Sequence, residues 1–215
     1  MARDVTYWNT VSGRASDMLE KLGSRNEYEH LIQATLALRP GDRVLDLGCG
    51  AGLNFRALRT AVGPDGEVTG IDYSPKMVEK ARSRAAAWRN VVVHQEDATT
   101  VSLPMGHYDA VLASFSISAT QNVPAVVRSV HRTLRPGGRL FAPDMHLAPR
   151  GVGAPVTWLF GVLYRLAARW TGVDVLTTIR EEFGNATVVN GKGIPLTTLP
   201  KFAPVLMITA TRHQR

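Results

Sequence analysis

The sequence lacks several features that would assign it to whole classes of protein. Its 215 residues include a single cysteine, Cys49, so an internal disulfide is excluded and a disulfide-stapled secreted fold is not expected. The first residues, Met1-Ala2-Arg3, lead into polar sequence without the apolar run of a signal peptide. We therefore expect a chain that is not secreted and that resides in the cytoplasm.

Compact basic runs and metal-ligand spacings are also missing. The formal net charge is +7, but the basic residues are dispersed over predicted helices, so a nucleic-acid partner is not expected. His30, His107 and His131 lack metal-ligand spacing, and His94 falls within a predicted strand, where we expect it to be buried. The sequence therefore predicts no metal site.

What the sequence does contain is a regular alternation of helices and strands. The chain is 45% hydrophobic and long enough to bury one core, which predicts a single domain over residues 1–215. This alternation is typical of a doubly wound, mostly parallel α/β sheet with helices on both faces, and two returning strands near the C-terminus predict an antiparallel edge. The predicted helices are 26–38, 53–62, 75–88, 122–134 and 177–183, and the predicted strands are 44–47, 67–71, 91–96, 108–115, 139–144, 187–189 and 205–211.

A glycine-rich turn follows the first predicted strand, in the segment VLDLGCGAG at 44–52. Bare backbone at such a turn lets a ligand approach closely. Two features disagree with a dinucleotide fingerprint: Leu53 occupies the place of its third glycine, and Asp46 would repel a pyrophosphate. A cationic ligand without phosphate would instead be attracted, and S-adenosylmethionine, with its ammonium, sulfonium and adenosine, is such a ligand. A nicotinamide oxidoreductase is correspondingly disfavoured.

Two later strand ends carry carboxylates suited to the adenosine half of that ligand. Asp72 follows the glycine turn by about 20 residues, the spacing at which a strand-end carboxylate accepts hydrogen bonds from ribose hydroxyls. Asp97 and Ala98 follow the third predicted strand, where they could bond the adenine amino group and lie against its face. The three acidic strand ends are expected to form one wall of the site.

Taken together, these segments resemble the class I, seven-stranded S-adenosylmethionine-dependent methyltransferases, in particular their quinone-biosynthesis-like, type 11 small-molecule branch. The resemblance covers residues from about 40 to 145 and implies a Rossmann-like fold, with S-adenosylmethionine converted to S-adenosylhomocysteine. The matching segments are VLDLGCGAG at 44–52, GIDYSPKMVEKAR at 70–82, QEDAT at 95–99, YDAVLASFSIS at 108–118 and LRPGGRLFAPDM at 134–145.

The resemblance also implies roles for individual residues. The three turn glycines would line the methionine and ribose, Asp72 would hold the ribose hydroxyls, and Asp97 with Ala98 would meet the adenine. The complete set of predicted cofactor-binding residues is Asp46, Gly48, Cys49, Gly50, Gly52, Asp72, Tyr73, Met77, Asp97, Ala98, Ser114 and Phe115.

The regions outside the core are expected to build the acceptor site. Residues 1–39 would form an N-terminal helical cap, 40–145 the cofactor-binding core, 150–176 a substrate lid, and 177–215 a C-terminal helix and strands. Within 155–170 a narrow polar stripe follows an otherwise apolar helix, which favours a lid over an apolar pocket or, alternatively, a helix that lies on a membrane. Trp158 and Tyr164 are the predicted substrate contacts.

The catalytic candidates are few, because a sulfonium makes its methyl group electrophilic before any residue acts. His146, just after the fifth predicted strand, is the best-placed base, with Asp144 either orienting it or remaining structural. Tyr7 is the second candidate, as an N-terminal aromatic that closes over the methionine end or packs in the core. Ser114, Ser116 and Ser118 would bond a ligand or serve as small packing residues.

The predicted function is methyl transfer to an apolar or aromatic small molecule by a monomer or homodimer. Two alternatives remain: a methyltransferase of a phospholipid or quinone head group with peripheral membrane contact, and a cofactor-binding homologue with a non-methyl reaction. A nucleic-acid methyltransferase is disfavoured because Ala113-Ser114-Phe115-Ser116 departs from the Asn/Asp-Pro-Pro-aromatic pattern of those enzymes.

Overall fold

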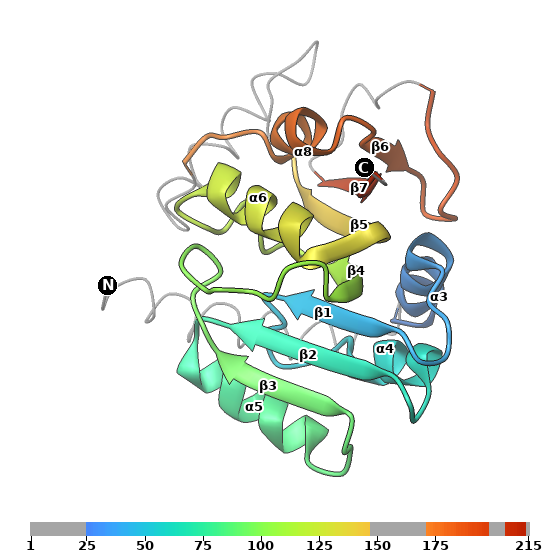
Figure 1. The fold of residues 1–215 in the computed structure, drawn as a ribbon, viewed down its shortest axis with the longest axis vertical. Coiled ribbons are helices and arrows are strands. Elements are labelled where there is room, and N and C mark those ends of the chain that lie inside the picture. Colours follow the sequence, from blue (N-terminus) through green and yellow to red (C-terminus); the bar gives the residue numbers. More distant parts are fainter. Residues whose placement is uncertain (1–24, 147–170, 198–204, 214–215) are drawn as a thin grey trace.

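The computed structural model describes residues 25–146, 171–197 and 205–213, which form one seven-stranded sheet with helices on both faces (Figure 1). The strands are β1 (Arg43–Leu47), β2 (Glu67–Asp72), β3 (Val91–Gln95), β4 (Tyr108–Leu112), β5 (Leu134–Met145), β6 (Thr187–Val189) and β7 (Val205–Thr211). The helices are α3 (Arg25–Leu36), α4 (Phe55–Val62), α5 (Pro75–Ala85), α6 (Val123–Thr133) and α8 (Val175–Phe183).

The strand order is β3-β2-β1-β4-β5-β7-β6, and the first five strands pair in parallel. β7 is antiparallel to both of its neighbours, so the predicted antiparallel C-terminal edge is confirmed. The chain leaves β1 towards β2 on one side and returns to β4 on the other. A ligand site is expected outside the carboxyl ends of the strands at such a reversal of strand order.

Two hydrophobic clusters cover the two faces of the sheet. In β1, Leu45 and Leu47 pack with α6 and α8, whereas Val44 packs on the opposite face with α3, α4 and α5. Alternation along a strand therefore directs Asp46 to the same face as Val44. The pleat of β1 therefore sets the direction of this carboxylate.

The helix starts follow the expected capping chemistry. Ser74 accepts a hydrogen bond from the Met77 backbone N–H at 3.3 Å, and Pro75 occupies the first helical position of α5. Asp174 caps α8 by accepting from the Thr177 N–H at 3.0 Å. This cap starts α8 at Val175, two residues before the predicted start.

Strand ends differ from the prediction around β4 and β5. The predicted break at 135–138 is absent, and β5 begins at Leu134 with a register shift between Tyr108 and Ala110 of β4. The Gly137 N–H donates to the Arg212 carbonyl at 2.8 Å, so pairing beyond β7 extends this segment. β4 ends at Leu112, yet the Phe115 N–H still donates to the Pro143 carbonyl at 2.8 Å.

One burial prediction was wrong. His94 is exposed, because β3 is the edge strand of the sheet and its outer side chains face solvent. Tyr7, Trp158, Tyr164 and the predicted helix at 155–170 lie outside the described residues. In the part of the chain that is described, no helix is both long and apolar enough to cross a bilayer.

Candidate functional site

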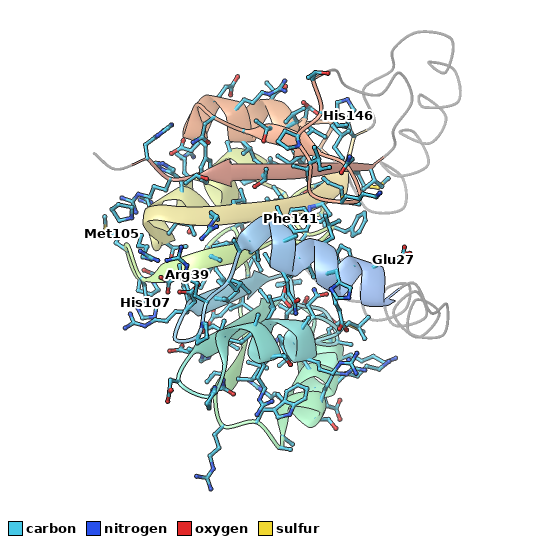
Figure 2. The ribbon with its side chains drawn as sticks, turned by 90° about the vertical axis from the view of Figure 1, so that its right-hand side faces the viewer. Glu27, Arg39, Met105, His107, Phe141 and His146 are labelled. Atoms are coloured by element: carbon cyan, nitrogen blue, oxygen red, sulfur yellow. The ribbon has the colours of Figure 1, made fainter. Side chains whose placement is uncertain are left out.

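The candidate site lies at the carboxyl ends of the parallel strands. Figure 2 shows His146, which follows β5, at one end of the molecule together with Glu27 of α3. Arg39, Met105 and His107 lie at the other end, where the parallel strands begin. The acidic and hydroxyl side chains predicted for the ligand therefore belong to the His146 end.

The three glycines of the turn after β1 have different surroundings. All three have positive φ values, 68° at Gly48, 54° at Gly50 and 74° at Gly52. A Cβ at Gly48 would collide with Ser116, and one at Gly52 would collide with the ring of Phe55. A Cβ at Gly50 would meet no atom of the described residues within 4 Å. Gly50 is therefore the turn glycine that faces open space, and the other two keep neighbouring segments in close contact.

Asp46 is a fully buried carboxylate that makes no hydrogen bond of good geometry with the described residues. Its exposed fraction is 0%, and neither oxygen has a partner of good geometry among the described residues. The pKa of Asp46 is raised to about 7, mainly by burial and also by the charge of Asp72, while a poorly aligned hydrogen bond from the Asn54 side chain opposes the shift. An unpartnered carboxylate of this kind gains most from a cation that reaches it.

Asp72 anchors the glycine turn. One carboxylate oxygen accepts from the Gly50 N–H at 2.8 Å, and the other accepts from the Ser74 N–H at 2.9 Å. Burial raises the pKa of Asp72, and these two backbone hydrogen bonds oppose the shift. Each oxygen keeps a second acceptor position, so Asp72 can fix the turn and still receive hydroxyl donors.

The end of β3 is held beside Asp72. The Glu96 N–H donates to the Asp72 carbonyl at 3.0 Å. One carboxylate oxygen of Asp97 accepts from the N–H of Thr99 at 2.8 Å and from its hydroxyl at 2.6 Å. Ala98 is partly buried against the hydrophobic cluster on the α6 face. The second and third acidic strand ends are therefore neighbours, as the sequence predicts.

Tyr28 of α3 is a residue of this site that sequence reasoning missed. Its hydroxyl lies 2.5 Å from the Ser114 hydroxyl, just beyond β4. Burial raises the pKa of Tyr28, the Ser114 hydrogen bond opposes the shift, and the charge of Asp46 adds to it. Its place in a predicted amphipathic helix was the available signal, but helical periodicity does not indicate which strand end a phenol reaches.

The serines after β4 divide between packing and anchoring. The Ser116 hydroxyl is buried without a partner among the described residues and lies against the glycine turn. Ser118 donates from both its N–H, at 3.0 Å, and its hydroxyl to the carboxylate of Asp144. Burial raises the pKa of Asp144 to about 6, although the hydrogen bonds from Ser118 and Met145 oppose the shift. Asp144 thus ties β5 to the segment after β4.

His146 is paired with Asp174, which the sequence did not identify as its partner. The His146 Nδ1 lies 2.9 Å from an Asp174 carboxylate oxygen, and 12% of the His146 side chain is exposed. Burial would raise the pKa of Asp174, but hydrogen bonds from His146 and Thr177 and the His146 charge outweigh it and lower the pKa to about 2. Of the two predicted alternatives for Asp144, the structural one is observed.

The remaining predicted cofactor residues are placed as follows. Met77 is 2% exposed, and Cys49 is 5% exposed, with burial raising the pKa of its thiol. Tyr73 is partly buried after β2, and Phe115 is 46% exposed. Cys49 and Met77 can therefore shape the site mainly through packing and backbone.

These surroundings suit a cationic, phosphate-free ligand. The unpartnered oxygens of Asp46 and Ser116 lie beside a turn that leaves open space only at Gly50. Asp72 adds acceptors beside the same turn. Among the described residues, no three His, Cys, Asp or Glu side chains are grouped as a metal ion would require.

Comparisons with known proteins agree with this geometry. Residues 44–138 match the family profile described as "Methyltransferase domain". The chain is 37% identical over 150 residues to the 27-O-demethylrifamycin SV methyltransferase of Amycolatopsis mediterranei, covering 68% of this chain and 52% of that protein. It is 36% identical over 113 residues to the 2-phytyl-1,4-naphtoquinone methyltransferase of Synechococcus elongatus, covering 51% and 48%.

Residues 44–138 belong to the methyltransferase-domain family, and the chain resembles the class I S-adenosylmethionine-dependent methyltransferases. A solved S-adenosylmethionine-dependent methyltransferase from Aquifex aeolicus has the same Rossmann-like fold, with a TM-score of 0.60 and 23% identity over 91% of this chain and 97% of that one. The chain spans about half the length of the two curated relatives. The segment that matches the family profile, residues 44–138, runs from β1 to the start of β5. It therefore contains the glycine turn and the acidic residues at the ends of β2 and β3.

Proposed function

We propose that the protein transfers a methyl group from S-adenosylmethionine to an apolar or aromatic small molecule. The observation that supports this most strongly is Asp46, a buried carboxylate that leads into the glycine turn and makes no hydrogen bond of good geometry with the described residues. When bound, S-adenosylmethionine supplies an electrophilic methyl group on a sulfonium. The protein then has to hold an acceptor in line with that methyl group and exclude water.

Each strand end would contribute one part of the cofactor site. Asp46 would bind the ammonium, and Asp72 would accept from the ribose hydroxyls while keeping its bonds to the turn. Asp97 and Ala98 would contact the adenine. Gly50 would allow the close approach, because its missing side chain leaves that position open.

His146 would act as the general base for an acceptor hydroxyl. The Asp174 carboxylate bonds Nδ1 and so selects the tautomer in which Nε2 accepts a proton. The low pKa of Asp174 keeps the carboxylate charged at every pH at which the enzyme would work, which stabilises the protonated imidazole once the proton has moved. Tyr7 stays a second candidate from the sequence.

The names of the two relatives support a small-molecule acceptor. One is named for a rifamycin substrate and the other for a phytyl naphthoquinone, both of which are organic acceptors and neither a macromolecule. We propose an acceptor of that general class for this chain. The exact acceptor and the atom methylated would follow from a screen for a metabolite that gains one methyl group from trideuteromethyl-labelled S-adenosylmethionine.

Calorimetry tests the cofactor directly. We expect S-adenosylmethionine and S-adenosylhomocysteine to bind and NAD not to bind. Asp72→Ala should weaken S-adenosylmethionine binding by about 1 to 3 kcal/mol, because it removes acceptors from the ribose and from the turn. Asp65→Ala, in the exposed turn before β2, is the matched control and should bind normally. Binding of NAD in preference to S-adenosylmethionine would contradict the proposal.

A second candidate is methylation of a quinone or phospholipid head group at a membrane surface. It is favoured by the naphthoquinone relative and by the apolar surface predicted for 155–170, which includes Trp158 and Phe160. Liposome sedimentation at low salt, with a Trp158→Ser, Phe160→Ser variant as the comparison, tests it. If the unmodified protein does not sediment with liposomes, the membrane candidate is to be abandoned.

A further inference from the structure

Phe115 has a backbone conformation that its surroundings must maintain. Its φ is 53°, in the left-handed region that residues with side chains rarely adopt. Among the described residues, the other such residue outside glycine is Ala37, with φ of 43°. Ala37 follows the last turn of α3 and donates to the Gln33 carbonyl at 2.8 Å, a common way for a helix to end. No helix ends at Phe115, so that explanation does not apply.

Anchors on both sides hold Phe115 in place. Its own N–H donates to the Pro143 carbonyl at 2.8 Å. The preceding Ser114 is hydrogen-bonded to Tyr28, and the following segment is fixed by the Ser118 N–H on Asp144 at 3.0 Å. A strained residue persists where its neighbours fix it in this way, and such residues cluster at functional sites.

Phe115 is exposed, and the residue that follows it contacts the glycine turn. Phe115 is 46% exposed, although its neighbour Ala113 is fully buried. The next residue, Ser116, contacts the glycine turn so closely that a Cβ at Gly48 would collide with it. Phe115 therefore adjoins the turn and follows β4, the neighbour of the strand that leads to His146.

We propose that the Phe115 ring forms a wall of the acceptor site and selects planar aromatic acceptors over saturated ones. The inference rests on the proposed function and assigns Phe115 to the acceptor, whereas the sequence predicts a cofactor contact. Aromatic rings attract one another in offset and edge-to-face geometries beyond the effect of buried area alone. A saturated ring of the same size lacks that attraction.

Four substitutions separate the ring from the strain. Phe115→Ala removes the ring and keeps the strained Cβ, whereas Phe115→Gly removes both. Phe115→Leu keeps an apolar side chain without an aromatic face. Ala37→Gly is the matched control, because it relieves the same backbone conformation at the opposite end of α3 from Glu27, away from the site.

Binding of S-adenosylhomocysteine is measured first, and 1-naphthol and decahydro-1-naphthol are then titrated into the saturated protein. The unmodified protein should bind 1-naphthol about 3- to 10-fold more tightly than its saturated counterpart. Phe115→Ala, Phe115→Gly and Phe115→Leu should lose this preference while S-adenosylhomocysteine affinity stays within about twofold. Ala37→Gly should keep it.

Thermal unfolding supplies the second readout. Phe115→Gly should unfold at a higher temperature than Phe115→Ala, because only glycine relieves the strain. The two variants should therefore differ in stability although both lose the acceptor preference. A 1-naphthol preference that is absent from the unmodified protein, or that survives all three substitutions, would overturn the inference alone. Equal losses of S-adenosylhomocysteine and 1-naphthol affinity would return Phe115 to the cofactor. Failure of S-adenosylhomocysteine to bind the unmodified protein would overturn the proposed function itself.

Discussion

The hydroxyl of Tyr28 on α3 lies 2.5 Å from the hydroxyl of Ser114, 86 residues later in the chain. This contact connects the helix before the glycine turn to the segment after β4 and places a phenol near the charge of Asp46. A helix that precedes the matched family segment at 44–138 therefore contributes a side chain to the candidate site.

The first prediction concerns this hydrogen bond. Tyr28→Phe and Ser114→Ala should each lower the free energy of unfolding by about 1 kcal/mol, because each removes one partly buried hydrogen bond. The double variant should cost less than the sum, since the same bond is lost only once. Urea unfolding of the four proteins measures the coupling. Strictly additive losses would show that the two hydroxyls do not interact.

The second prediction concerns stability and pH at Asp46. Burial raises its pKa from 3.8 to about 7, so the folded protein binds this proton more tightly than the unfolded chain does. The resulting stabilisation is complete below about pH 4 and is lost as the pH rises through 7. Between pH 5 and pH 8 the unmodified protein should therefore lose about 2 kcal/mol more stability than Asp46→Asn.

Urea unfolding at the two pH values measures that difference. The cost of burying the asparagine amide is the same at both, so only the slope with pH is compared. Asp144, whose pKa is raised to about 6, contributes a loss of the same sign in both proteins and therefore cancels. Parallel pH dependences in the two proteins would contradict an elevated pKa at Asp46.

The third prediction concerns protons and ligand binding. A cation that reaches Asp46 favours its ionised form, so S-adenosylmethionine binding near pH 6 should release close to one proton. Calorimetry in phosphate and in imidazole, which both buffer near pH 6 and have different ionisation enthalpies, measures the number of protons released. 5′-Methylthioadenosine, which lacks the ammonium, is the matched ligand and should release none from this group. Equal release by both ligands would remove Asp46 from the ammonium site.

The fourth prediction uses the open position at Gly50. Gly50→Ala meets no atom within 4 Å, so the protein should fold, with about 1 to 2 kcal/mol lost to the left-handed conformation. The new methyl group should nevertheless weaken S-adenosylmethionine binding by tenfold or more, about 1.4 kcal/mol, because it occupies the approach of the ligand. Gly41→Ala has the same open surroundings and a φ of 89° and is the control. Equal affinity in both variants would move the ligand away from this turn.

The fifth prediction separates the roles of His146 and Asp174. His146→Ala should lower methyl transfer by about 10²- to 10⁴-fold without changing S-adenosylhomocysteine affinity, as expected for a general base. Asp174→Asn keeps an oxygen that can cap α8, but the carboxylate charge on Nδ1 is lost. It should lower the rate constant kcat, and it should also lower the free energy of unfolding at neutral pH, because the lowered pKa of Asp174 means that its ionised form stabilises the fold. A rate unchanged by both substitutions would remove the pair from the mechanism.

Local sequence predicted the part of the site that is built within short segments. Asp46, Gly50 and Asp72 lie next to one another because each directly ends or follows a parallel strand, and neighbouring strands bring those ends together. The antiparallel C-terminal edge was predictable from the two returning strands near the C-terminus. The position of β7 between β5 and β6 could not be predicted from local sequence, since strand order depends on which edges are free in the folded sheet.

The contacts that sequence reasoning missed all join distant segments. Tyr28 reaches Ser114 through the packing of α3 on the sheet, and His146 reaches Asp174 through the docking of α8. Asp174 carries a local signal as a helix cap, followed three residues later by Thr177, but capping does not indicate a histidine partner. Likewise, the φ of Phe115 is a property of its anchors and has no signature in its own residue type.

The placement of β7 also determines the order in which the sheet can be completed during synthesis. β7 lies between β5 and β6 and pairs with both of them. Because β7 comes last of the three in the sequence, β5 and β6 leave the ribosome before the strand with which they pair. Until Thr211 has emerged, the nascent chain carries an unpaired β5 edge, which is open to pairing with other chains. The five parallel strands, β1 to β5, can therefore assemble early during synthesis, while the sheet is completed only when β7 has emerged.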